Sequence, residues 1–216
     1  MLGVAAITKT AWRLAVRTDE ELIAEILNGE SAAFSELAIR HRPRVERLCQ
    51  RFFSDPEVAR DLAQECFIRA YTALATYRRE MPFGGWLRAI ATNLCYDELR
   101  RRRRRPEELV GDFTAPEVQW MNLVNDATPE EIVAAAEERR EAHDLAHRLL
   151  DSLRAEDRTV LILKDSEELS VSEIADLMGW SEAKVKIRAF RARQALRKQA
   201  ERMRAAAKRE RWSRRQ

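Results

Sequence analysis

Apolar residues recur at helical spacing over the first hundred positions, and capping signals divide this part of the chain into four predicted helices. Thr18 with Glu21 forms a capping-box pattern, which predicts a short helix that ends at Asn28 and Gly29. Ser31 is expected to cap the second helix through its side chain.

The four predicted helices are expected to form one domain, in which the second, third and fourth helices complete the bundle begun by the first. Pro43 lies inside the second helix and predicts a kink there, whereas Pro56 marks the first turn of the third. A loop over 76–82 leads to the fourth helix, predicted over 83–104. The residues expected to face the core are Phe34, Leu37, Val45, Leu48, Leu62, Phe67, Ala70, Leu74, Trp86 and Ile90.

A second group of helices follows the stretch 106–126, which contains Pro and Gly and has no steady period. Thr128, Pro129 and Glu131 combine an N-cap, a first-position Pro and a capping box. A helix is therefore predicted to begin there and to run to about Ser152. A short helix is predicted over 157–164.

A helix–turn–helix pattern occupies the C-terminal part of the chain. Ser170 with Glu173 caps one predicted helix, Gly179 ends it, and Ser181 caps a long final helix. The contacts expected of the final helix are those of Val185, Ala189, Ala192 and Leu196 with Ile174, Leu177 and Leu161. The predicted fold class is therefore all-α, with two small helical domains joined by a linker.

Composition supports this architecture and limits the class of protein. Charged residues make up 35% of the 216 positions, and 6 Gly and 6 Pro supply little turn material for a sheet. No run of about 18 apolar residues occurs, so no membrane-spanning helix is predicted. The stretch 1–17 is expected to be a frayed leader or a start-site extension rather than a signal peptide. Cys49, Cys66 and Cys95 form no CxxC pattern, which favours buried thiols in a reducing, cytoplasmic compartment.

The net charge of +3 hides a segregation of charge along the chain. Residues 100–105 are all Arg, every charged residue over 106–138 is acidic, and Lys and Arg predominate again from Lys184 onward. Basic blocks on either side of an acidic linker indicate two nucleic-acid-facing domains joined by a segment that avoids DNA.

Two helical faces are candidates for binding partners. Asp61, Gln64 and Glu65 are three and four positions apart and share one face, which suits a basic partner surface. In the final helix, the exposed basic stripe is expected to consist of Lys184, Ile187, Arg188 and Arg191. Such a stripe can enter the major groove, where long side chains reach base edges and phosphates.

The signatures over 61–105 and 153–197, taken together and in this order, resemble the extracytoplasmic-function (ECF) group of bacterial RNA polymerase sigma factors, within the sigma-70 family. The resemblance implies a region 2-like domain over 18–105, which binds core polymerase and the −10 element. It also implies a region 4-like helix–turn–helix domain over 129–198, which binds the −35 element. The remaining parts are an extension (1–17), an acidic linker (106–128) and a basic tail (199–216).

The function implied by the resemblance is that of an alternative sigma factor rather than an enzyme, and it implies no cofactor. Such a protein binds core RNA polymerase, recognises the −10 and −35 promoter elements and promotes promoter melting. The implied partners are core RNA polymerase, promoter DNA and an anti-sigma factor. The DNA is duplex at −35 and melted at −10. The chain itself is not expected to enter the membrane, but an anti-sigma factor can hold it at the membrane surface.

The resemblance also assigns residues to three surfaces. It assigns the binding of core RNA polymerase to Asp61, Gln64 and Glu65. The −10 surface comprises Arg78, Arg79 and Asn93 around a captured base, with Arg100, Arg101 and Arg103 on upstream phosphates. The −35 surface comprises Lys184, Lys186, Ile187, Arg188 and Arg191. Ile187 departs from the small polar residue that the family often has at this position.

Two other classes of protein stay open on the sequence alone. A conventional helix–turn–helix regulator would bind duplex DNA as a dimer without core polymerase, and a sigma-mimicking protein would sequester an anti-sigma factor. His143 and His147 are four positions apart, but no third ligand is nearby, so no metal site is predicted. No phosphate-cradling glycine loop, nucleophile elbow or HExxH motif occurs, so nothing indicates catalysis.

Overall fold

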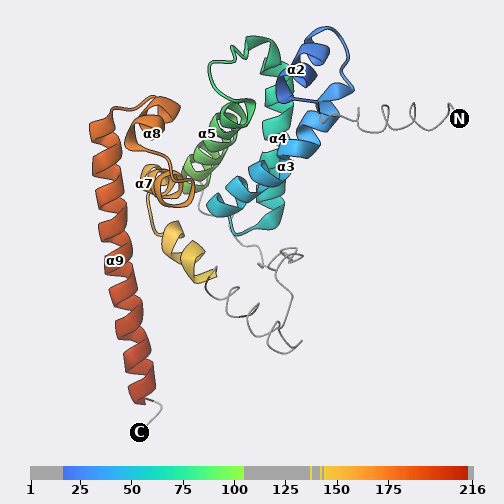
Figure 1. The fold of residues 1–216 in the computed structure, drawn as a ribbon. Coiled ribbons are helices and arrows are strands. Elements are labelled where there is room, and N and C mark those ends of the chain that lie inside the picture. Colours follow the sequence, from blue (N-terminus) through green and yellow to red (C-terminus); the bar gives the residue numbers. More distant parts are fainter. Residues whose placement is uncertain (1–16, 105–136, 138–141, 143, 214–216) are drawn as a thin grey trace, which may run out of the picture.

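The computed structural model describes residues 17–104, 137, 142 and 144–213 (Figure 1). Every regular element in these residues is a helix, which confirms the predicted all-α class. The extension up to residue 16, the acidic linker 106–128 and the helix start at Thr128 lie outside the described residues.

Four helices form the first domain, as the sequence predicts (Figure 1). Its elements are α2 (Asp19–Leu27), α3 (Ala33–Phe52), α4 (Pro56–Ala73), the 3₁₀ turn η1 (Leu74–Thr76) and α5 (Phe83–Arg104). Helix α3 contacts α2, α4 and α5, and α4 also contacts α5, so these helices enclose one core. Helix α3 continues through Pro43 as a single element, and the kink expected there stays a prediction.

The predicted caps of this domain are confirmed at α2 and wrong at α3. The Glu21 backbone N–H donates to Thr18 Oγ1 at 3.2 Å, and the Thr18 N–H donates to Glu21 Oε2 at 2.8 Å. Ser31 does not cap α3 with its side chain; the N-cap position belongs to Ala32, whose backbone is already helical. The chain enters α3 from a hydrogen-bonded turn after Gly29, so no extended residue stands before the helix to direct a side chain onto its first N–H groups.

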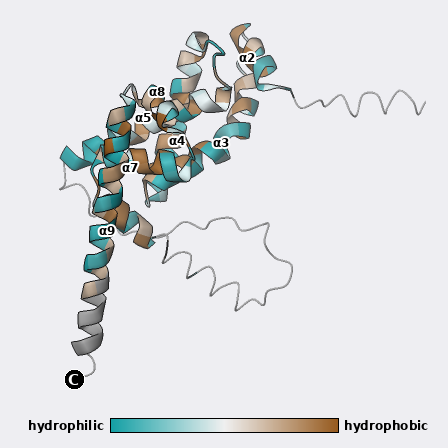
Figure 2. Cartoon of the chain, turned by 60° about the vertical axis from the view of Figure 1, so that its left-hand side comes forward, coloured by the Kyte–Doolittle hydropathy of each residue, from teal (hydrophilic) through white to brown (hydrophobic). Residues whose placement is uncertain are grey.

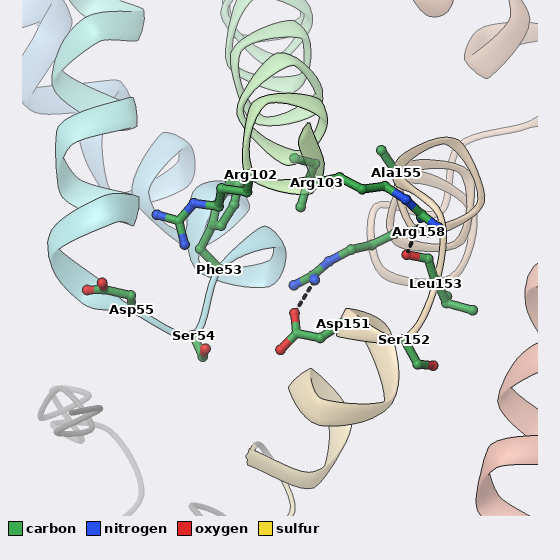
Figure 3. A pocket seen from close by; sticks show the side chains of 11 residues that line it. Phe53, Ser54, Asp55, Arg102, Arg103, Asp151, Ser152, Leu153, Ala155 and Arg158 are labelled. Carbon is green, nitrogen blue, oxygen red and sulfur yellow. Dashed lines mark hydrogen bonds and ion pairs between the residues drawn. The ribbon is translucent and has the colours of Figure 1, made fainter. Parts of the chain in front are cut away.

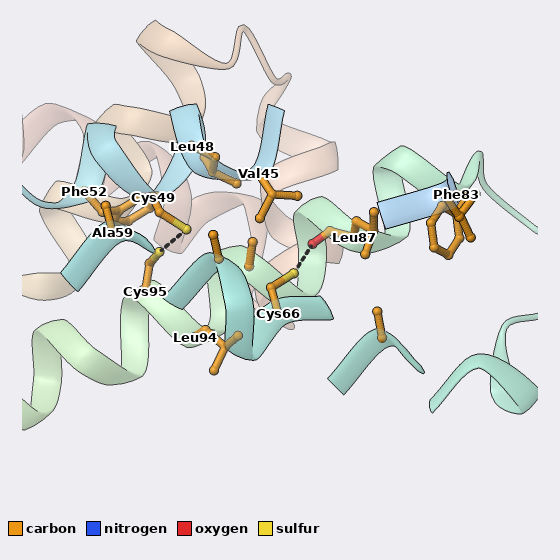
Figure 4. Packing of buried hydrophobic residues seen from close by; sticks show 14 of the residues in the cluster. Val45, Leu48, Cys49, Phe52, Ala59, Cys66, Phe83, Leu87, Leu94 and Cys95 are labelled. Atoms are coloured by element: carbon orange, nitrogen blue, oxygen red, sulfur yellow. Dashed lines mark hydrogen bonds between the residues drawn. The ribbon is translucent and has the colours of Figure 1, made fainter. Parts of the chain in front are cut away.

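The core of the first domain is closed by a stripe of small residues on α4. The fully buried positions of this helix are Ala59, Ala63, Cys66 and Ala70. Leu62 and Phe67, expected to face inward, are only half-buried beside this stripe. Small side chains allow α4 to lie close to α3 and α5, and larger residues are left to flank the contact. Figure 4 shows the three thiols inside this core, with the Sγ atoms of Cys49 and Cys95 3.8 Å apart.

The second domain consists of helical residues 144–151 and four further elements. These are α7 (Ala155–Leu161), the π-helical turn η3 (Ile162–Ser166), α8 (Val171–Met178) and α9 (Glu182–Ser213). The short helix expected over 157–164 thus begins two residues earlier and changes to a π-helical turn at its end. Helix α9 continues past Lys198, the last residue of the predicted second domain, to Ser213 (Figure 1), and the bounds of that domain stay a prediction.

The two domains contact each other in this structure. Helix α5 packs on α7, and Ile162 from the second domain is 2% exposed within the core cluster of the first. Figure 2 shows hydrophobic residues gathered around α7, where the domains meet.

Candidate polymerase and nucleic-acid interfaces

The acidic face of α4 is present on the surface of the first domain. Asp61 and Gln64 are exposed, and Glu65 forms an ion pair at 2.7 Å with Arg69, one helical turn further on. The structure therefore brings the three predicted residues together on one accessible face.

An apolar groove lies directly beside this face, and the sequence did not indicate it. The groove encloses about 490 Å³ between α3 and α4, and Gln64 is one of its lining residues. Three of its apolar side chains are exposed: Ile39 by 72%, Ile68 by 51% and Tyr71 by 46%. The available signal was that these residues lie outside the inward-facing stripes of their helices, although they are large and apolar.

The predicted −10 loop runs from residue 77 to residue 82 at the N-terminal end of α5. Arg78 and Arg79 are both exposed, and Arg79 has a left-handed backbone with φ of 59°. Such a backbone is uncommon for a residue other than glycine and marks a local constraint. The Tyr77 hydroxyl donates to the Met81 carbonyl at 2.6 Å, and the Tyr77 ring packs on Phe83. The loop is therefore held in a defined shape with both arginines outward.

Asn93 and Arg100 lie on the same face of α5, two turns apart, and both are exposed. Arg100 is stacked over the Tyr96 ring at 5.6 Å. Arg101 instead pairs with Glu98 at 2.7 Å, and Arg103 reaches the Leu153 carbonyl of the second domain at 3.4 Å. Of the three arginines assigned to upstream phosphates, Arg100 alone is thus on the face of Asn93.

Glu98 organises the arginine-rich end of α5. Burial raises the pKa of its carboxyl, but hydrogen bonds from Arg101 and Arg102 outweigh burial, and the pKa is lowered.

Trp86 and Ile90, expected to be core residues, are half-buried and packed against the core.

The helix–turn–helix has the geometry that its sequence predicts. Ser170 and Glu173 form a reciprocal capping box, and Gly179 ends α8 with φ of 63°. Ser181 Oγ accepts a hydrogen bond from the Lys184 N–H at 3.3 Å. One apolar cluster contains Val185 and Ala189 with Ile174 and Leu177, and a second contains Ala192 and Leu196 with Leu161.

The predicted recognition face of α9 is exposed at three positions and half-buried at two, Lys184 and Arg188. Ile187 is 52% exposed, and Arg191 and Lys186 are also exposed. Lys184 lies over the Trp180 ring at 3.8 Å, which orients its ammonium group. The side chain of Arg188 is only 19% exposed.

Arg188 is held by a carboxylate of its own domain. Its Nη1 donates to Asp157 Oδ1 at 3.2 Å.

One further exposed residue was missed in the sequence: Phe190, at 62% exposure, stands three positions after Ile187 on the outer side of α9. That spacing was the available signal.

Both domains match family models. The model for sigma-70 region 2 matches residues 37–105, and the model for sigma-70 region 4 matches residues 143–196. The RNA polymerase sigma-H factor of Pseudomonas aeruginosa is 33% identical over 178 residues, covering 82% of this chain and 91% of that protein. This chain belongs to the sigma-70 family. It is an ECF sigma factor: the ECF sigma-E factor of Escherichia coli is 32% identical over 183 residues, covering 83% of this chain and 92% of that protein.

Two solved structures share this fold, and one of them is of the sigma factor RpoE. CnrH in complex with the cytosolic domain of CnrY aligns with a TM-score of 0.56 at 23% identity, covering 83% of this sigma factor and 95% of CnrH. RpoE from Bartonella quintana, in complex with the anti-sigma factor NepR, aligns with a TM-score of 0.51 at 20% identity. That alignment covers 78% of this sigma factor and 96% of RpoE.

Sigma factors act in transcription initiation and are not enzymes. Within the described residues, no cluster of His, Cys, Asp and Glu side chains could hold a metal ion, and His143 lies outside them. No described helix is both long and apolar enough to cross a membrane.

Proposed function

We propose that this sigma factor binds core RNA polymerase through α4, captures a melted −10 base on α5 and reads the −35 element with α9. The observation that carries this proposal is the exposed apolar groove beside an acidic face on α4. Contiguous exposed apolar side chains with a polar rim are typical of protein–protein contacts.

The polymerase contact is proposed to combine the groove and the acidic face. Ile39, Ile68 and Tyr71 supply apolar area that is removed from water on binding. Asp61 and Glu65 face a basic surface of the polymerase, and Gln64 belongs to both parts of the contact. Burial of the apolar part supplies affinity, whereas the charges set orientation and partner choice.

The −10 contact is proposed to centre on Asn93, whose amide can donate to and accept from the edge of a flipped base. Extruding a base costs a few kcal/mol of unstacking, which the protein must offset with new contacts. Arg78 and Arg79 at the loop supply cations for the displaced strand, and Arg100 supplies one for a phosphate upstream. Arg101 and Arg103 are proposed to bind upstream phosphates as well, after Arg101 gives up its ion pair with Glu98 and Arg103 its hydrogen bond to the Leu153 carbonyl.

The −35 contact is proposed to use the first turns of α9. Lys184, Lys186 and Arg191 reach phosphates and base edges, and Ile187 contacts a thymine methyl group. Arg188 reads a base after it exchanges Asp157 for DNA.

An anti-sigma factor is proposed as a further partner, since the structure of RpoE holds the anti-sigma factor NepR. We place the protein in the cytoplasm with RNA polymerase, where a membrane-bound anti-sigma factor can retain it.

The test is reconstituted initiation. Core RNA polymerase is incubated with and without the protein on a library of genomic fragments from the source bacterium, and transcript 5′ ends are sequenced. The proposal expects start sites that appear only with the protein, share two upstream elements and become permanganate-sensitive near −10. Start sites independent of the protein, or duplex binding without opening, would overturn it.

A further inference from the structure

A cavity lies where the C-terminal end of α5 meets the second domain (Figure 3). It encloses about 410 Å³, a size within the range of about 300–1,000 Å³ that is common for small-molecule sites. Its apolar lining comes from Phe53 and Leu99 of the first domain and from Leu153 and Ala155 of the second. A flat ring placed against these side chains would remove apolar surface from water.

Arg102 brings a cation to the wall of this cavity. Its guanidinium lies over the Phe53 ring, 5.0 Å from the ring centroid. Glu98 accepts the Arg102 Nε–H at 2.7 Å, an arrangement in which the two outer nitrogens can still donate to an acceptor in the cavity. Because guanidinium and aromatic planes both favour stacked partners, Arg102 and Phe53 together also suit a flat ring.

Arg158 supplies a second cation, which is almost completely buried. The residue is 4% exposed and lines the cavity, where Figure 3 shows its guanidinium beside Asp151. Its Nη1 pairs with Asp151, and its Nη2 donates to the Phe52 carbonyl. Its Nε is also buried but has no hydrogen-bond partner among the residues that the structure describes. Since a buried donor without a partner is destabilising, an acceptor in the cavity would stabilise this arginine.

A basic hollow of about 290 Å³ lies next to the cavity, since Arg103 and Ala155 line both spaces. The hollow is lined by four arginines and one acidic residue: Arg100, Arg103, Arg104, Arg154 and Glu156. In the cavity, Arg102, Arg103 and Arg158 face Asp55 and Asp151. Arginine therefore predominates in both spaces. Guanidinium groups bind phosphate through pairs of parallel hydrogen bonds, so this concentration of arginine favours a ligand with more than one phosphate.

We propose that this sigma factor binds a nucleoside polyphosphate at the junction of its two domains. The ring lies in the apolar cavity against Phe53 and Arg102, the first phosphate meets Arg102 and Arg158, and the phosphate chain passes Arg103 into the basic hollow. The apolar cavity selects for the ring and the hollow for the phosphates, so neither part alone fills the site.

The ligand would share arginines with promoter DNA. Arg100 and Arg103 line the basic hollow, and both also belong to the surface proposed for phosphates upstream of −10. A bound nucleotide and the promoter would therefore compete for the same two cations. This consequence rests on the proposed function, whereas the binding of the nucleotide to the free chain does not.

Isothermal titration calorimetry of the full chain, without polymerase or DNA, tests the site. The probes are adenosine and guanosine triphosphates, the two nucleosides, and inorganic tripolyphosphate. Arg102→Ala removes a cation from the cavity, and Arg101→Ala is its matched control, because Arg101 pairs with the same Glu98 but lines neither space. Ser152→Trp fills the cavity without a change of charge, since Ser152 is exposed at its lining.

At least one of the two triphosphates is expected to bind saturably, with one site per chain. Its nucleoside and tripolyphosphate are each expected to bind at least about tenfold more weakly, because each occupies only one part of the site. Arg102→Ala and Ser152→Trp are expected to weaken the triphosphate by about tenfold or more, and Arg101→Ala by less than about threefold. Circular dichroism with thermal unfolding identifies any variant that fails to fold.

Absence of saturable binding by both triphosphates would overturn the proposal. Equal losses in Arg101→Ala and Arg102→Ala would do the same, because they would reduce the binding to an effect of overall positive charge. Tripolyphosphate that binds as tightly as the nucleotide would exclude a ring from the cavity. A promoter duplex whose affinity falls with Ser152→Trp would assign the cavity to DNA phosphates instead. Failure of the initiation assay counts only against the proposed function, since the titration contains neither polymerase nor promoter.

Discussion

The guanidinium of Arg188 donates to the carboxylate of Asp157 at 3.2 Å, across 31 positions of sequence. This pair fixes the direction of the arginine before any DNA is present, but it also occupies the group expected to read a base. If Arg188 reads a base, as proposed, binding at −35 exchanges one carboxylate partner for a base edge, and only a correct base offers a bidentate replacement.

Replacing Arg188 with Ala is expected to cost about 1–3 kcal/mol at the cognate −35 element and to relax preference at one base pair. Competition binding against the four variants of each position in the element measures this. Arg193→Ala is the matched control, because Arg193 pairs with Asp165 and lies on the opposite side of α9 from Lys184 and Arg191. A uniform loss across all sequences would make Arg188 a phosphate contact.

Asn93→Ala is expected to impair promoter opening more than closed-complex binding, because the amide meets a base only after the base leaves the stack. Permanganate reactivity of the bubble and filter binding of the closed complex separate the two steps. Asp97→Ala, one turn further along the same exposed face, is the control. Equal losses in both assays would remove Asn93 from base capture.

Ile187 is expected to recognise a thymine methyl group. Substituting deoxyuridine for one thymine of the −35 element should cost the wild type about 0.8 kcal/mol, the value of one buried methylene-sized group. Ile187→Ala should be insensitive to the same substitution in a binding titration. If the variant and the wild type respond alike at every thymine, the contact does not exist.

The free energy of unfolding is expected to depend on pH in the alkaline range through the Cys66 thiol. Burial raises its pKa to about 12 in the folded protein, so the unfolded chain loses this proton first as pH rises. The stabilisation is complete below the unfolded pKa and is lost between about pH 8.5 and pH 12, by up to about 1.4 kcal/mol per pH unit. Urea unfolding across this range should show the free-energy gap between wild type and Cys66→Ala narrowing. A constant gap would contradict this linkage.

Helix boundaries could be predicted from local sequence signals, whereas contacts between distant residues could not. The caps at Thr18, Ser170 and Gly179 depend on neighbours within a few positions, and the structure confirms them. Ser31 failed because the turn before it sets the backbone, which a capping residue alone does not reveal.

The packing partners of the site required the fold. The small-residue stripe of α4 leaves Leu62 and Phe67 at its margin, a consequence of how closely three helices approach. Likewise, Ile162 looks like a core residue of its own domain but packs into the other. The residues on the α4 face and the α9 stripe were predictable because helical spacing alone brings them together.

The affinity of the purified protein for core RNA polymerase, measured beside the double reversal Asp61→Lys and Glu65→Lys, decides whether α4 carries the polymerase contact. Glu20→Lys with Glu30→Lys supplies the control, since both residues are exposed and lie outside α4. We predict tight binding by the wild type and the control, and binding at least about tenfold weaker in the α4 variant with unchanged helix content. Equal affinity of all three proteins, or no binding by the wild type, would contradict it.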